Sequence, residues 1–171
     1  MNSYGIYFLA LVLLASDVVA KPLGRAREGI VRTLHGKPAL CLPVNAEVDF
    51  PVAGLSVSEA GTNPGVYFST DLKSSGVPIV LQPTECIVLG RSISSYNVSG
   101  GLAVERMRFG YIYTGRVNRV RDNKNPNTFY TFAFCVSRSP EGGFEYINYG
   151  STATDEEQKH CDALTVRIMG K

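Results

Sequence analysis

The sequence contains no tryptophan and only two histidines, and it lacks the short motifs of common catalytic and cofactor-binding folds. There is no G-x-S-x-G nucleophile elbow, Gly-rich phosphate loop, EF-hand loop or dinucleotide fingerprint. His160 is adjacent to Cys161, and on an extended segment two adjacent side chains point to opposite faces. A Cys–His catalytic pair is therefore not expected there. The sequence predicts a protein that is not an enzyme and binds neither a cofactor nor a metal.

The chain also lacks a large excess of either positive or negative charge. The chain has 17 basic and 15 acidic residues, a net charge of +2. Removal of residues 1–20 keeps all 17 basic residues and removes Asp17, which leaves 14 acidic residues and a net charge of +3. So mild a charge favours neither a nucleic acid nor an anionic membrane as the partner.

A long hydrophobic run occurs only at the N-terminus. The apolar segment Ile6–Ala15 is followed by Val18-Val19-Ala20, a small-residue cleavage pattern, which predicts a signal peptide over residues 1–20. The run is too short for a stable membrane span. It is preceded by no Lys or Arg, so a retained N-terminal anchor is the alternative to cleavage after Ala20. We expect a periplasmic or secreted protein.

Cysteines are few, and all follow the predicted signal peptide. They are Cys41, Cys86, Cys135 and Cys161. An even number in an exported chain predicts two disulfides, and the absence of any C-x-x-C spacing argues against a structural zinc site. The favoured pairing is Cys41–Cys86 with Cys135–Cys161, because segments close in sequence tend to be neighbours in a sheet, but the other two pairings stay open.

Beyond a basic segment at residues 21–29, which we expect to be a mobile leader, short apolar runs alternate with Gly, Pro, Asn and Ser turns. This pattern predicts an all-β, immunoglobulin-like β-sandwich forming a single domain over residues 30–171. The tryptophan and the tyrosine corner of true immunoglobulin domains are missing. The expected strands are Ile30–His35, Ala39–Val44, Gly54–Ala60, Val66–Asp71, Val77–Leu81, Cys86–Ile93, Leu102–Tyr113, Phe129–Arg138, Phe144–Tyr149 and Ala163–Met169.

Two of these segments alternate clearly between large apolar and other residues. The predicted core rows are Met107, Phe109, Tyr111 and Tyr113 on the first, and Tyr130, Phe132, Phe134 and Val136 on the second. Only Asp155–His160 has a helical composition, and Thr154 with Glu157 three residues later predicts a capping box at its start.

A basic segment lies between the two alternating strands. Arg116, Arg119 and Arg121 cluster beside the polar loop 121–127. Arginine pairs bidentately with carboxylates and is enriched at interface hot spots, so these three residues are the candidate binding site for an acidic partner. The alternative is a solvated strand edge whose charges prevent edge-to-edge pairing.

Four fragments resemble a known family: Gly36–Pro43, Pro83–Gly90, Leu102–Tyr113 and Tyr130–Val136. Their order and content resemble type VI secretion immunity lipoproteins of Gram-negative bacteria. The chain departs from that pattern in lacking a lipid-attachment cysteine and in having Cys161. The resemblance implies a binding protein that blocks a toxin effector in the periplasm by protein–protein contact.

Two other functions remain open from the sequence. A structural or adhesive sandwich subunit is expected to expose an unpaired strand or to donate one. A secreted hydrolase would use catalytic residues that no motif marks.

Overall fold

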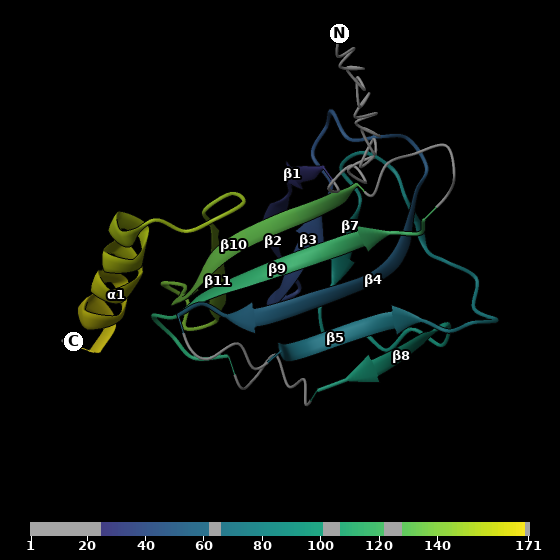
Figure 1. The fold of residues 1–171 in the computed structure, drawn as a ribbon. Coiled ribbons are helices and arrows are strands. Elements are labelled where there is room, and N and C mark those ends of the chain that lie inside the picture. The colour runs from purple at the N-terminus through teal and green to yellow at the C-terminus, as the bar shows by residue number, and fades with distance from the viewer. Residues whose placement is uncertain (1–24, 62–65, 101–106, 122–127, 170–171) are drawn as a thin grey trace, which may run out of the picture.

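The computed structural model describes residues 25–61, 66–100, 107–121 and 128–169, which form two β-sheets around a shared core and one C-terminal helix (Figure 1). The predicted signal peptide and its cleavage site after Ala20 lie outside the described residues. In the part of the chain that is described, no helix has the length and apolarity needed to cross a membrane.

The larger sheet has eight strands. Six follow one another across it: β1 (Ala26–Glu28), β10 (Phe129–Arg138), β9 (Ile112–Arg119), β4 (Phe50–Glu59), β5 (Val66–Leu72) and β8 (Tyr96–Ser99). The other two are β11 (Phe144–Asn148), which pairs with the second half of β10, and β6 (Val80–Leu81), which pairs with the start of β4. All neighbours are antiparallel except β1 and β10, which are parallel.

The smaller sheet has three strands, in the order β2 (Ile30–Leu34), β3 (Lys37–Cys41) and β7 (Cys86–Val88). Side chains join it to β11 of the larger sheet. The Val31 N–H donates to Asn148 Oδ1 at 2.8 Å, and the Tyr146 N–H donates to Thr33 Oγ1 at 3.1 Å. These bonds satisfy backbone donors at the seam between the two sheets.

The core lies between the sheets and confirms the predicted face of β10. Tyr130, Phe132, Phe134 and Val136 are all fully buried. They pack in one cluster with residues of the smaller sheet such as Leu40. The all-β, sandwich-like single domain is therefore confirmed, whereas the strand order does not confirm the immunoglobulin-like subtype.

Both disulfides have the favoured pairing. Cys41–Cys86 joins directly opposed residues of β3 and β7. Cys135–Cys161 ties β10 to the helix α1 (Asp155–Met169). Two disulfides are typical of an oxidising compartment outside the cytoplasm.

The capping box at the start of α1 is confirmed. The Glu157 N–H donates to Thr154 Oγ1 at 3.3 Å, and the Thr154 N–H donates to Glu157 Oε2 at 2.7 Å. The predicted strand Ala163–Met169 is wrong, because the helix continues through it. Its β-branched residues favoured a strand, but no Gly or Pro interrupts the helix before Met169, and Cys161 anchors it to the sheet.

The predicted strand Leu102–Tyr113 is also wrong in its described part, where β9 begins only at Ile112. Gly110 has a φ of +76° and turns the chain, so the alternation around it does not belong to one strand. Met107 and Tyr113 are buried as predicted, but Tyr111 is 38% exposed. Residues 102–106 of the expected strand lie outside the described residues.

Two strands had no clear sequence signal. Residues 26–28 of the expected leader form β1, which pairs through its backbone with β10 and so needs no apolar alternation. The short strand β8 was likewise not expected.

Candidate functional site

The basic segment lies at the end of β9, next to the beginning of β10. Thr131 and Phe129 of β10 are the partners of Arg116 and Asn118 in the register between the two strands. Arg116 alternates with the buried Val117, so it lies on the outer face of the sheet, away from the core. The predicted site residues thus lie where three strands, β4, β9 and β10, run side by side (Figure 1).

Arg116 is exposed and held by an aromatic ring. Its guanidinium carbon lies 3.6 Å from the centroid of the Phe129 ring, a cation–π contact that restrains the long side chain. Among the described residues, no ion pair joins Arg116 or the exposed Arg121 to a carboxylate. Within that part of the chain, neither guanidinium group is therefore neutralised by a carboxylate.

Arg119 has a different environment. Its side chain is only 10% exposed, and its Nη1 donates to Glu47 Oε2 at 2.7 Å. The other oxygen of Glu47 lies 3.1 Å from Nη2 of Arg27, on β1. One carboxylate thus neutralises part of the charge of two arginines on either side of β10. Arg119 is therefore a largely buried, partly neutralised member of the site, and its charge is less available to a partner than that of Arg116 and Arg121.

The three predicted arginines line one open concavity of about 440 Å³, which we call the arginine hollow. It is lined by Ala53, Asp71, Leu72, Arg116, Asn118, Arg119, Val120, Arg121, Thr128 and Phe129. The structure therefore brings Arg116, Arg119 and Arg121 together, although the residues that complete the walls come from strands distant in sequence.

The backbone of β4 is irregular beside the hollow, which Ala53 of this strand lines. The register between β4 and β9 shifts between Val52 and Gly54, as in a β-bulge. Gly54 pairs with Asp71 on one side and with Asn118 on the other, so it lies between two walls of the hollow. A Cβ at Gly54 would lie 2.4 Å from the Thr70 carbonyl oxygen and 3.1 Å from Asp71 Oδ1. Only glycine fits at this position, because the closest atom is a backbone oxygen of the neighbouring strand.

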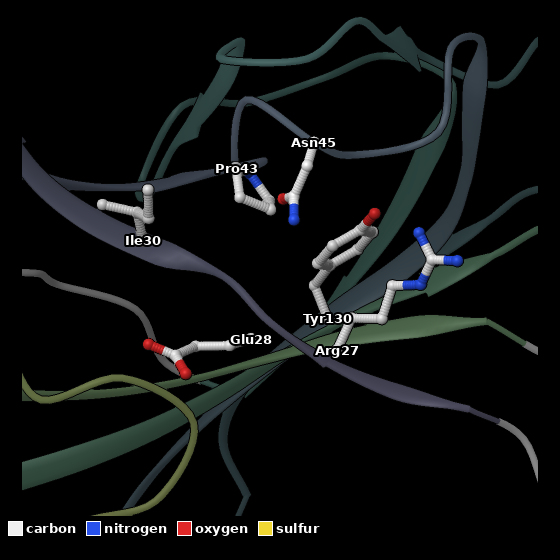
Figure 2. A pocket seen from close by; sticks show the side chains of 6 residues that line it. All are labelled: Arg27, Glu28, Ile30, Pro43, Asn45 and Tyr130. Carbon is white, nitrogen blue, oxygen red and sulfur yellow. The ribbon is translucent and has the colours of Figure 1, made fainter.

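A second cavity, of about 670 Å³, lies on the other side of β10, between β1, β2 and the loop after β3 (Figure 2). Figure 2 shows Arg27 and Tyr130 side by side, with Asn45 opposite them and Glu28 across the space. The Tyr130 hydroxyl is itself fully buried and has no hydrogen-bond partner among the described residues. The charged groups that line this cavity are the guanidinium of Arg27 and the carboxylate of Glu28, which carry opposite charges, and Asn45 adds a neutral carboxamide.

The histidine in α1 makes one polar contact. Tyr149 Oη lies 2.9 Å from His160 Nδ1, and the rings lie edge to face. Burial, together with the nearby charge of Glu157, raises the pKa of Tyr149 above its usual value. The contact fixes α1 beside β11 and places no nucleophile in a cavity. Within the described ranges, no three His, Cys, Asp or Glu side chains are arranged to hold a metal ion.

Sequence reasoning missed three residues that shape the site. Arg27 was assigned to the leader, Glu47 lies in an irregular loop, and Gly54 carries no side chain. Their roles come from the parallel pairing of β1 and from the bulge in β4, which no local pattern in the sequence reveals.

Comparison with protein-family models, with curated proteins and with solved structures finds no match. The resemblance to type VI secretion immunity lipoproteins therefore stays a prediction, and the functional argument depends on the site itself.

Proposed function

We propose that the chain is an exported binding protein that neutralises a protein partner through the arginine hollow. The observation that carries the proposal is the convergence of Arg116, Arg119 and Arg121 on one open concavity. Arg116 is held in place by the Phe129 ring, and neither Arg116 nor Arg121 has an ion pair among the described residues. Arginine is enriched at interface hot spots, and a side chain that is already held in place loses little conformational freedom on binding.

The resemblance to immunity lipoproteins indicates what kind of partner is bound, namely a toxin effector. A protein of that family blocks a toxin effector by covering its active or assembly surface, and it needs no catalytic group of its own. A periplasmic or secreted location fits the predicted signal peptide and the two disulfides.

A toxin gene beside the gene of this protein would favour this function, so titration calorimetry against the purified product of the adjacent gene tests the proposal. The double variant Arg116→Ala/Arg121→Ala removes both exposed guanidinium groups and leaves the Glu47–Arg119 ion pair intact. We expect it to fold normally and to bind about 2 kcal/mol more weakly, about a 30-fold rise in Kd.

The matched control is Arg32→Ala/Arg91→Ala, which removes the same charge from two exposed arginines outside the hollow. We expect this control to bind like the wild type, because exposed charges outside an interface contribute little to affinity. Equal weakening by both variants would show a general charge effect. Absence of binding by the wild-type protein would contradict the neutralisation of this partner.

A further inference from the structure

We infer that the arginine hollow takes one acidic side chain of the partner protein, an Asp or Glu whose carboxylate lies between Arg116 and Arg121 and whose own backbone N–H faces Asp71. The inference rests on the proposed function and names the chemistry of the contact. It follows from the distribution of charge within the hollow, which is not uniformly positive.

The positive side of the hollow is formed by Arg116 and Arg121. Both are exposed, and within the described part of the chain neither has an ion pair. The stacking of Arg116 on Phe129 leaves its planar guanidinium fixed, and a fixed fork matches the two oxygens of a carboxylate.

The protein already contains a bound carboxylate of this kind. Glu47 uses one oxygen for Arg27 and the other for Arg119, at 3.1 and 2.7 Å. It reaches the same end of the sheet from a loop, as a side chain of a partner would. Arg116 and Arg121 line one hollow, and in the described part of the chain no carboxylate forms an ion pair with either.

The opposite wall carries a negative charge. Asp71 is exposed and lines the hollow, and its Oδ1 lies 3.1 Å from the position that a Cβ at Gly54 would occupy, so the carboxylate lies over the neighbouring strand β4. An oxygen at that place accepts a hydrogen bond from an N–H and repels a second anion. Asn118, the neighbour of Gly54 on the other side, adds a neutral carboxamide.

This polarity selects among anionic partners. The phosphodiester chain of a nucleic acid has no N–H beside its anions, so nothing in that chain would donate to Asp71, whose carboxylate repels it. An acidic residue of a protein presents one carboxylate and, a few bonds away, a backbone N–H. The hollow is thus suited to an acidic protein segment and disfavours a nucleic acid, which agrees with the low net charge of +2.

Amide chemical-shift mapping by NMR on the purified, disulfide-bonded protein tests this inference. The probes are hexaglutamate and hexaglutamine peptides, blocked at both ends, and hexathymidylate. We expect hexaglutamate to shift the amides of Gly54, Asp71 and Asn118, while hexaglutamine does not. Arg116→Gln/Arg121→Gln should raise the Kd for hexaglutamate about 10-fold or more, and Arg32→Gln/Arg91→Gln should leave it within about 2-fold.

Two results would overturn the inference. One is the absence of saturable shifts in the hollow with hexaglutamate. The other is binding of hexathymidylate by the wild type as tightly as hexaglutamate, which would make the site a general anion site. If the product of the adjacent gene binds through Arg116 and Arg121 while hexaglutamate does not, the proposed function stands and this inference alone fails. If hexaglutamate binds and that product does not, the proposed function fails instead.

Discussion

Replacement of Phe134 by alanine is the most direct test of the packing that supports the arginine hollow. Phe134 is fully buried in the centre of β10, and its ring lies 5.8 Å from the Tyr113 ring and 6.0 Å from the Tyr146 ring, centroid to centroid. Truncation removes the buried ring and leaves a cavity, because close-packed neighbours relax only in part. Such changes cost about 3–5 kcal/mol, and the two lost aromatic pairs place the value near the upper end.

For a domain of this size, a loss of about 4 kcal/mol lowers Tm by roughly 8–16 °C and removes a large fraction of a net stability of about 5–15 kcal/mol. Urea denaturation followed by far-UV circular dichroism, without reductant, measures the free energy of unfolding. The control is Phe129→Ala, on the same strand but on the outer, half-buried face. Equal midpoints for the two variants, or a loss below about 1 kcal/mol for Phe134→Ala, would show that the face assignment is wrong.

Three further predictions follow from contacts elsewhere in the fold. Thiol titration of the denatured, unreduced protein should find no free thiol, and loss of the Cys135–Cys161 disulfide should cost about 2–4 kcal/mol; two or more free thiols would contradict this. Thr154→Ala removes the cap of α1 and should cost about 1 kcal/mol in the same denaturation assay, whereas an unchanged midpoint would mean that the cap adds nothing. Burial raises the pKa of Tyr96, so the unfolded chain ionises first and stability should fall as pH rises above about 10. Tyr96→Phe should remove the part of the loss of stability above about pH 10 that comes from this tyrosine. It should also cost about 1–3 kcal/mol of stability at neutral pH, because the Tyr96 hydroxyl donates to the Val52 carbonyl. If stability falls with pH as steeply in the variant as in the wild type, Tyr96 is not the source of the fall.

The sequence was informative where side-chain pattern and structure coincide. In β10 the period of two marks the face that meets the main core, with the large aromatic residues on it. The other face of its second half is buried as well, against the second cluster around Cys135 and Cys161, which the pattern did not reveal. The disulfide pairing followed from proximity in sequence, and the capping box marked the start of α1. The alternation in β10 and the capping box are local signals, each contained in a single stretch of sequence, whereas the disulfide pairing followed from the order of the cysteines along the chain.

Features that depend on distant partners were not predictable in the same way. The turn at Gly110 interrupts an alternation that reads as one long strand, and β1 is held by backbone bonds to β10 that no side-chain pattern encodes. The arginines of the site were identified from their clustering. The counter-ion Glu47 and the glycine at position 54 beside the hollow were not, because tertiary contacts bring them to β9.

Arginine labelling of the complex shows directly whether Arg116 and Arg121 lie in the interface with the partner. The protein is treated with an arginine-specific dicarbonyl reagent, alone and bound to the product of the adjacent gene, and the modified sites are quantified by mass spectrometry. The account predicts that Arg116 and Arg121 react in the free protein and are protected in the complex, while Arg32 and Arg91 react equally in both. Protection of Arg32 or Arg91, with Arg116 and Arg121 still reactive, would place the interface elsewhere and contradict the account.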